Sequence, residues 1–218
     1  MRSERRLRTA FCVSGHGSLF RAAVARCDDI GIEPALLILE TKSAADLDDF
    51  ARGRGIAVMR LDPRDRAAFD VAVTKALVDE QPDLTALTFD RILPATAVDA
   101  LRHRIINVHP ALLPAFAGTR GIERTLAAGV KVGGATIHEV IAEVDAGPII
   151  AQAAVEVLPN DDVLSYGRRL YERLEPMFLQ VLRWFAEGRV VHDAAGRVVV
   201  RGARYDSLPV VPALEPFS

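Results

Sequence analysis

The sequence is poor in cysteine, has a single tryptophan and contains no long apolar run. No stretch approaches the roughly 20 consecutive apolar residues that a membrane-spanning helix needs, so no membrane partner is expected. The two cysteines, Cys12 and Cys27, have no neighbours in a CxxC or CxxxH pattern. Free thiols in a reducing cytoplasm are therefore favoured over a disulfide or a metal site.

An excess of charge of one sign is also missing, since 27 Lys and Arg stand against 29 Asp and Glu. The net charge of -2 gives no general attraction to nucleic acid or to acidic membranes. With 50% apolar and 26% charged residues, the 218-residue chain has the composition of a soluble globular protein. Residues 1–8 are rich in arginine but the apolar stretch behind them is short, which favours a flexible, solvated tail over a targeting signal.

Short β-rich runs alternate with longer helical stretches from Arg8 onward. Such alternation predicts parallel strands joined by right-handed crossovers, with helices on both faces of the sheet. We therefore expect an α/β fold with a doubly wound, mostly parallel sheet. The predicted strands are Thr9–Val13, Ala35–Leu39, Ala57–Leu61, Leu84–Phe89 and Ile105–Val108, and the predicted helices are Ser18–Cys27, Ser43–Arg54, Arg64–Gln81 and Pro94–Arg102.

The second half of the chain has a different pattern. It predicts a hairpin whose turn contains Gly147 and Pro148, then one long amphipathic helix that ends at Gly188, then a second hairpin. No repeat or linker is visible, so we expect one domain over residues 9–204, followed by an irregular C-terminal tail of residues 205–218. The predicted segments are Gly133–Val140 and Ile149–Val157 for the first hairpin, Asp161–Glu187 for the helix and Val190–Arg201 for the second hairpin.

A glycine-rich loop follows the first predicted strand and opens the first helix. Glycines there allow a tight turn and the close approach of an anion to backbone amides, a common way of holding phosphate. A turn from strand to helix needs glycine in any case, so the pattern alone does not decide between structure and binding. The candidate substrate-binding residues are Ser14, Gly15, His16, Gly17 and Ser18.

Asn107 and His109 are separated by one residue at the end of a predicted strand, so both side chains leave the same face. Pro110 then turns the chain away from regular structure. Asp145 precedes Gly147-Pro148, where it is either a turn former or a functional carboxylate. A carboxylate beside an imidazole fixes the ring tautomer and raises its basicity, while an amide stabilises a developing oxyanion. These three residues are the candidate catalytic groups.

Three motifs together make the chain recognisable: Asn107-Val-His109-Pro-Ala-Leu-Leu-Pro114, Gly134-Ala-Thr-Ile-His138, and Val144-Asp145-Ala-Gly-Pro-Ile-Ile150 with Gln152. The chain resembles the folate-dependent formyltransferases, nearest to those that act on glycinamide ribonucleotide, from the Ser14 loop to Gly188. The resemblance implies a Rossmann-like formyltransferase fold and an enzyme of one-carbon metabolism that uses 10-formyltetrahydrofolate as co-substrate. It implies folate contacts at Phe89, Asp90, Arg91, Ile92, Leu93, Ile141, Ala142 and Glu143, and requires no metal.

The chain departs from the family pattern at residues expected to bind the molecule that accepts the formyl group. Leu19 stands where the family usually has an asparagine that helps to hold the substrate phosphate, and Thr119–Glu123 replaces a stretch that contains histidine. The alternatives are therefore transfer to another amine or hydroxylamine, hydrolysis of formyltetrahydrofolate, and a non-catalytic nucleotide-binding module. The short stretch before the first strand lowers the expectation of hydrolysis, because related hydrolases carry a further domain there. The expected assembly is a monomer or a homodimer.

Overall fold

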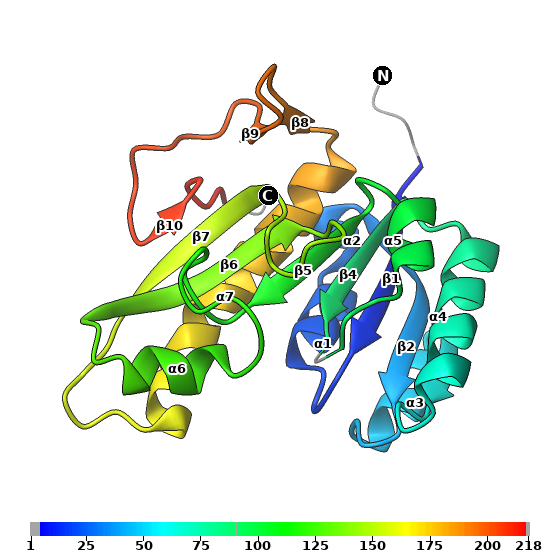
Figure 1. Cartoon of the computed structure of the whole chain (residues 1–218). Coiled ribbons are helices and arrows are strands. Elements are labelled where there is room, and N and C mark those ends of the chain that lie inside the picture. The colour runs from blue at the N-terminus through cyan, green and yellow to red at the C-terminus, as the bar shows by residue number, and fades with distance from the viewer. Residues whose placement is uncertain (1–4, 90, 217–218) are drawn as a thin grey trace. The chain divides into compact units, whose positions relative to one another are not determined.

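The computed structural model describes residues 5–89 and 91–216 (Figure 1). The chain forms two compact units, residues 1–106 and residues 107–218. The sequence led us to expect one domain over residues 9–204, and those boundaries stay a prediction. Leu7 and Arg8, which were expected in the N-terminal tail, are the first residues of a strand.

The first unit contains a parallel sheet with the strand order β4-β1-β2-β3. The two central strands are apolar along most of their length, as parallel strands covered on both faces must be. Its elements are β1 (Leu7–Val13), α1 (Ser18–Ala25), α2 (Cys27–Ile30), β2 (Ile32–Glu40), α3 (Asp46–Arg52), β3 (Ala57–Leu61), α4 (Arg66–Glu80), β4 (Leu84–Thr88) and α5 (Ala95–Ala100).

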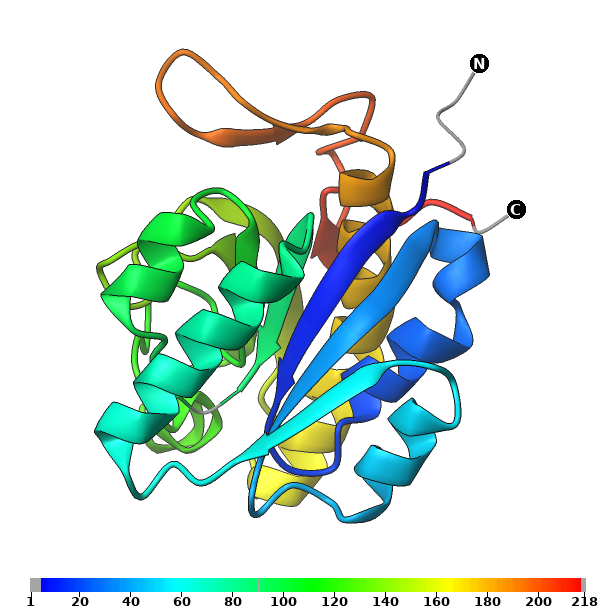
Figure 2. The ribbon, with the colours of Figure 1, turned by 90° about the vertical axis from the view of Figure 1, so that its right-hand side faces the viewer.

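Helices cover both faces of this sheet, as predicted. Figure 2 shows α4 on one side of strands β1 to β3, and α1, α2 and α3 on the other. Phe11 on β1 and Phe20 on α1 are fully buried, and their rings meet edge to face with centroids 5.2 Å apart. Because the strands are parallel, β1, β2 and β4 all end at the same edge, where ligands gather in sheets of this kind.

Strand β5 (Ile105–His109) carries the chain from the first unit into the second. The second unit contains an antiparallel sheet in which β6 lies beside β7, and β7 beside β10. Thr136 on β6 is paired with Gln152 on β7, so the predicted hairpin is confirmed. The other elements of this unit are α6 (Gly121–Ala127), β6 (Val132–Glu139), β7 (Ile149–Glu156), α7 (Val163–Ala186), β8 (Val190–His192), β9 (Val198–Val200) and β10 (Val210–Val211).

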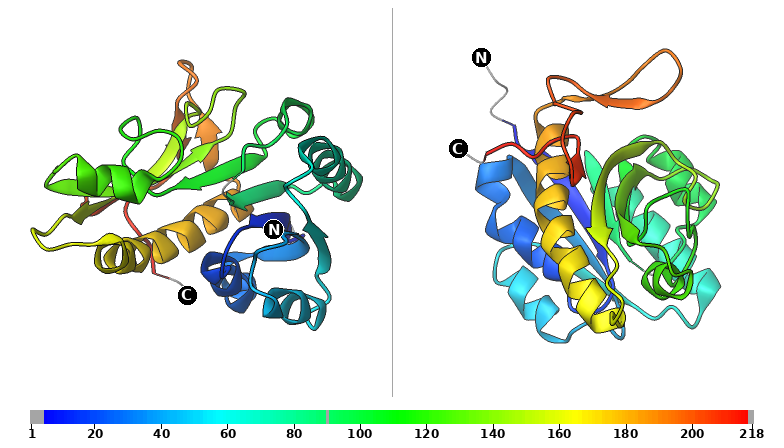
Figure 3. Two further views of the ribbon diagram at one scale, coloured as in Figure 1. Left: turned by 60° about the horizontal axis from the view of Figure 1, so that its bottom comes forward. Right: turned by 90° about the vertical axis from the view of Figure 1, so that its left-hand side faces the viewer.

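The long helix α7 begins with a reciprocal cap. The Asp162 carboxylate accepts a hydrogen bond from Ser165 N at 2.7 Å, and the Ser165 hydroxyl accepts one from Asp162 N at 2.9 Å. This arrangement satisfies two amides that the first helical turn leaves without partners. Further along, α7 buries an apolar stripe that includes Leu174, Phe178 and Trp184. Figure 3 shows α7, in yellow and orange, running alongside β7.

The structure differs from the sequence-based expectations in three places. The helix expected over Ser18–Cys27 is two helices, and α6 was not predicted because Gly121 at its start and the absence of a capping side chain conceal it. The C-terminal segment was expected to be irregular, yet β10 pairs with β7 there. Glu215 anchors the same segment through a 2.6 Å ion pair with Arg189 and a backbone hydrogen bond to Gln180.

The predicted fold class is confirmed: an α/β fold with a doubly wound, mostly parallel sheet, C-terminal hairpins and one long helix. Among residues 5–89 and 91–216, no helix combines the length and the apolar character that crossing a bilayer demands.

Candidate functional site

The predicted substrate-binding loop lies between β1 and α1 in the first unit. Gly15 and Gly17 have φ values of +69° and +66°, in the left-handed region that favours glycine. A Cβ at Gly17 would also lie 3.0 Å from the Leu47 side chain. His16 and Ser18 are exposed, whereas Leu19 is only 3% exposed and packs in the core. The loop therefore offers backbone and exposed polar groups, but position 19 cannot contact a ligand.

The predicted folate-contacting segment after β4 is partly buried. Phe89 and Leu93 are buried, and the Phe89 ring stacks on Phe69 with centroids 5.8 Å apart. Ile92 is 58% exposed, and its carbonyl accepts a 2.8 Å hydrogen bond from Arg66. Arg91 is exposed and forms an ion pair with Glu40 at 3.2 Å. Asp90, which was predicted to contact folate, lies outside the described residues.

In the second unit, the three candidate catalytic residues meet at the end of β5. His109 Nδ1 lies 3.3 Å from Asp145 Oδ2, and Asn107 Nδ2 donates a 3.5 Å hydrogen bond to Asp145 Oδ1. The side chains of His109 and Asp145 are only 5% and 9% exposed. Asp145 thus holds the imidazole with one oxygen and the amide with the other.

His138, on β6, is a fourth member of this cluster. It is 2% exposed, and its Nδ1 donates a 2.8 Å hydrogen bond to the Glu139 carbonyl. Its Nε2 lies 3.3 Å from Asn107 Nδ2 and 3.5 Å from Asp145 Oδ1. His138 therefore helps to fix the orientation of the Asn107 amide.

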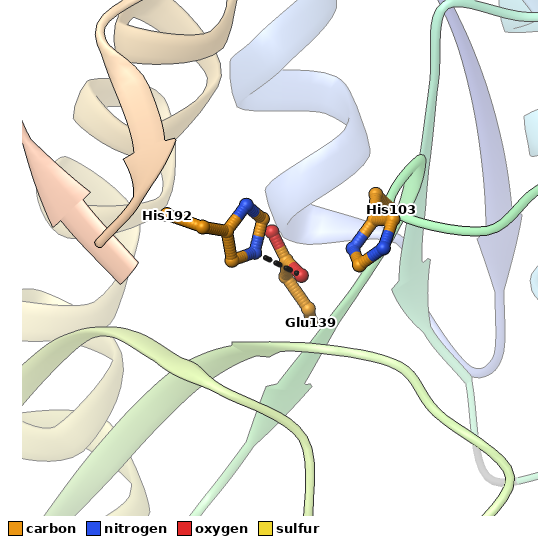
Figure 4. Close-up of side chains that lie close together, drawn as sticks. All are labelled: His103, Glu139 and His192. Atoms are coloured by element: carbon orange, nitrogen blue, oxygen red, sulfur yellow. Dashed lines mark hydrogen bonds and ion pairs between the residues drawn. The ribbon is translucent and has the colours of Figure 1, made fainter. Parts of the chain in front are cut away.

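The second hairpin contacts Glu139, the residue after His138. The Glu139 side chain is 2% exposed, and His192 on β8 contacts its carboxylate at 2.9 Å. Figure 4 shows the His192 ring facing Glu139. Because the buried acid is paired, the end of β6 is fixed at the point where the Asp145 loop begins.

Backbone groups of the segment after Pro114 complete the cluster. Gly118 N donates a 2.7 Å hydrogen bond to Asp145 Oδ2, and the Phe116 carbonyl oxygen lies 3.0 Å from His109 Nε2. Neither contact has a signature in the sequence, because both are made by main-chain atoms. Phe116 has φ of +59°, which shows that the segment bends sharply at this point.

Two polar side chains of the β6–β7 pair hold the turn of Pro110–Pro114. Thr136 Oγ1 donates to the Ala111 carbonyl at 2.8 Å and accepts from Leu113 N at 3.0 Å. Gln152 Nε2 donates to the Leu113 carbonyl at 2.9 Å. These bonds satisfy buried backbone groups of the turn and hold it in place behind His109.

The predicted folate contacts of the second unit lie in the loop between β6 and β7. Ile141 is half-buried, whereas Ala142 and Glu143 are exposed. The Glu143 carbonyl accepts a 3.4 Å hydrogen bond from Ala146 N, which closes the turn that carries Asp145. Asp145 itself has φ of +54°. The loop therefore presents exposed backbone and side-chain atoms next to the carboxylate.

Burial and nearby polar groups together set the pKa values of His109 and Asp145. Burial lowers the pKa of His109 below its ordinary value of 6.5, although the Asp145 carboxylate and the Phe116 carbonyl act in the opposite direction. The pKa of Asp145 is also lowered: burial alone would raise it, but hydrogen bonds from His138 and Gly118 N outweigh that effect. At neutral pH the pair is therefore a neutral imidazole beside a carboxylate.

We expect the His109 ring to titrate below pH 6.5, and at still lower pH in Asp145→Asn, which lacks the charge that raises its pKa. Titration of the imidazole nitrogens by NMR measures both values, and a pKa above 6.5 would contradict the assignment. Because the folded-state pKa is lowered, His109 contributes stability that is present above pH 6.5 and is lost as the pH falls from 6.5 through the folded-state value.

Gly147 is needed because the Asp145 turn runs close to β6. A Cβ at this position would lie 1.8 Å from the Glu139 carbonyl oxygen, which also holds His138 Nδ1. We expect Gly147→Ala to displace the Asp145 turn and to lower the catalytic activity at least about tenfold, since small misplacements of catalytic groups are costly. A matched control is Gly167→Ala, where the nearest atom lies at 3.8 Å. Equal activity of the two variants would show that the turn tolerates the displacement.

The chain is similar to known proteins of one family. The family model described as formyl transferase matches residues 7–182. Phosphoribosylglycinamide formyltransferase of Mycobacterium tuberculosis (strain ATCC 25618 / H37Rv) is 40% identical over 172 residues, which cover 75% of this chain and 77% of the relative. The enzyme of that name from Bacillus subtilis (strain 168) is 33% identical over 179 residues, covering 80% and 92%.

Solved structures give the same result. Glycinamide ribonucleotide transformylase 1 from Symbiobacterium toebii superposes with a TM-score of 0.82 at 35% identity, covering 91% of this chain and 95% of that one. A formyltetrahydrofolate deformylase from Pseudomonas syringae pv. tomato superposes with a TM-score of 0.81 at 27% identity, covering 89% and 66%. The matched motifs, the fold and the relatives agree, and the chain belongs to the formyl transferase family.

Proposed function

We propose that this protein transfers the formyl group of 10-formyltetrahydrofolate to the amine of glycinamide ribonucleotide, a step of purine synthesis. The observation that carries the proposal is the cluster of Asn107, His109 and Asp145 in a member of the formyl transferase family. The relatives from M. tuberculosis and B. subtilis, both named phosphoribosylglycinamide formyltransferase, support glycinamide ribonucleotide as the acceptor.

The three residues have complementary roles in this reaction. The acceptor nitrogen attacks the formyl carbon, a new C–N bond forms, and the carbonyl electron pair moves to oxygen. Asn107 and His109 stabilise this oxyanion, and Asp145 orients His109 and guides the proton that leaves the amine. The bond from the formyl carbon to N10 then breaks, and N10 takes up a proton. No covalent bond to the protein is needed at any stage.

The two substrates are assigned to different segments. Folate contacts Phe89, Arg91, Ile92 and Leu93 after β4 and Ile141, Ala142 and Glu143 after β6, with Asp90 as a further predicted contact. The exposed backbone of the second segment and the apolar side chains of the first suit the polar edge and the flat face of a pterin. The acceptor contacts the loop of Ser14, Gly15, His16, Gly17 and Ser18, whose amides at the start of α1 favour a phosphate.

The acceptor half of the site has fewer side-chain donors than the family pattern. Leu19 is buried, and Arg21 already pairs with Asp46 at 2.8 Å. Arg120, by contrast, is 75% exposed, and its ion pair with Glu123 is long, at 3.7 Å. Its guanidinium is therefore available to an anion. This difference motivates a second candidate acceptor within the same chemistry, a different amine or a hydroxylamine.

Hydrolysis is the other candidate function, because the deformylase from P. syringae has a similar structure. Water would then replace the amine, and the products would be formate and tetrahydrofolate. Formate release by the purified protein without any amine would favour this function. We expect none above the background rate, because a transferase reserves the attacking position for its amine.

A panel assay tests the proposed function directly. The full chain is incubated with 10-formyltetrahydrofolate and, in turn, glycinamide ribonucleotide, other small amines and hydroxylamines, and the loss of the formyl donor is followed by absorbance. We expect glycinamide ribonucleotide to give the highest kcat/KM. A higher value with another acceptor would assign the protein to a different pathway, and no turnover with any of them would overturn the proposal.

The organisation around this function is also proposed. We infer one formyltransferase domain over residues 9–204, a range that contains most of the 7–182 family match. A cytoplasmic location and a monomer or homodimer suit an enzyme whose partners are folate and a small amine. Size-exclusion chromatography with light scattering distinguishes the two assemblies.

A further inference from the structure

Glu40 is a buried carboxylate outside the catalytic cluster. It is the last residue of β2 and is 5% exposed. A buried acid is costly unless charged or polar partners surround it. Its partners therefore indicate what the residue does.

Those partners follow two other strands of the sheet, β1, which pairs with β2, and β4, which pairs with β1 on its other side. Ser14, directly after β1, donates its hydroxyl hydrogen to Glu40 Oε1 at 2.8 Å. Arg91, in the segment after β4, donates from Nε to Oε1 at 3.2 Å and from Nη2 to Oε2 at 3.4 Å. Ser14 is the first residue of the proposed acceptor loop, and Arg91 belongs to the proposed folate-contacting segment. The Glu40 carboxylate thus contacts both Ser14 and Arg91.

We propose that Glu40 is a positioning residue shared by the acceptor and folate subsites. The inference rests on the proposed function, because it uses the assignment of the two segments to the two substrates. Charge-assisted hydrogen bonds are stronger than neutral ones, so the carboxylate orders Ser14 and Arg91 before either substrate arrives. The Arg91 side chain is 42% exposed, so it remains accessible to a ligand while its direction is fixed.

The hydrogen bond from Ser14 has a second consequence. A serine hydroxyl has one hydrogen, and in this protein Glu40 accepts it. That hydrogen is therefore not available to a phosphate oxygen of the acceptor. Any phosphate of the acceptor is accordingly left to the amides further along the loop.

Glu40→Gln keeps the size of the side chain and removes its charge. We expect the KM values for 10-formyltetrahydrofolate and for glycinamide ribonucleotide both to rise about tenfold, with kcat changed less than threefold. Ser14→Ala should raise only the KM for the acceptor. The matched control is Glu33→Gln, since Glu33 also lies on β2 but is exposed and paired with Arg8 at 3.0 Å. It should leave both KM values unchanged.

Binding of 5,10-dideazatetrahydrofolate, measured by calorimetry, gives a readout that does not depend on turnover. The affinity should fall about tenfold in Glu40→Gln and stay unchanged in Glu33→Gln. The inference would be overturned if a folded Glu40→Gln protein kept the wild-type kcat and both KM values within twofold of wild type. The proposed function would then remain in place. Absence of wild-type formyl transfer would overturn the proposed function instead.

A double-mutant cycle covers the case in which Glu40→Gln does not fold. Arg91→Lys perturbs the Glu40 contact from the folate side, and Ser14→Ala removes it from the acceptor side. If Glu40 links the folate subsite to the acceptor subsite, Arg91→Lys raises the KM for the acceptor about threefold in the wild-type background. The same substitution has no such effect when Ser14 is already alanine. Equal effects in the two backgrounds would contradict the link.

Discussion

Asp145→Asn is expected to lower kcat of formyl transfer by about 10³-fold, within the range for groups that orient a catalytic imidazole and support proton transfer. The reason is the number of groups that Asp145 holds: it contacts Asn107, His109, His138 and Gly118 N. An asparagine keeps the shape but presents an NH₂ group to one of these partners and removes the charge. Steady-state kinetics with saturating 10-formyltetrahydrofolate measure the loss.

Asp99→Asn is the matched control, because Asp99 is an exposed acid on α5, and it should retain wild-type kcat. Thermal unfolding of both variants separates loss of catalysis from loss of folding. If Asp145→Asn kept kcat within about threefold of wild type while remaining folded, the catalytic assignment would be wrong, and a module that only binds its ligands would become the better description.

His109→Ala is expected to lower kcat by about 10²-fold or more, because the substitution removes an oxyanion partner and a proton-transfer group together. Its effect is expected to be smaller than that of Asp145→Asn, since Asn107 and Asp145 keep their mutual contact. Single-turnover measurement of the chemical step provides the comparison, because product release does not enter it.

His192→Ala is the control for this variant. His192 is also an imidazole paired with an acid, Glu139, at 2.9 Å, but it lies on β8 of the second hairpin. We expect its kcat to stay within about threefold of wild type. A comparable loss in both histidine variants would indicate a general disturbance of the second unit and not the removal of a reacting group.

Much of the fold was predictable because it depends on local patterns. The ends of β3 at Ala57 and Leu61 agree with the sequence, and the other parallel strands differ from it by one to three residues at an end. Alternation along β5 correctly placed Asn107 and His109 on one face. These features need only neighbouring residues to be specified.

The rest depends on contacts between residues far apart in the chain. Glu40 lies 26 residues from Ser14 and 51 from Arg91, so nothing near it in the sequence reveals its partners. His138 lies 31 residues from Asn107, and only the folding of β6 brings the two side chains together. The roles of the Phe116 carbonyl and Gly118 N were hidden for a different reason, because every residue has these atoms and only the fold selects them.

The contact between His109 and the Phe116 carbonyl depends on which imidazole nitrogen carries the hydrogen. A neutral imidazole has one hydrogen, while Asp145 Oδ2 and the Phe116 oxygen both lie within reach as acceptors. When the hydrogen faces Asp145, two lone pairs oppose each other at Nε2, and this repulsion weakens the grip of residue 116 on the ring. The tautomer that Asp145 favours therefore also loosens the contact between the ring and the Phe116 carbonyl.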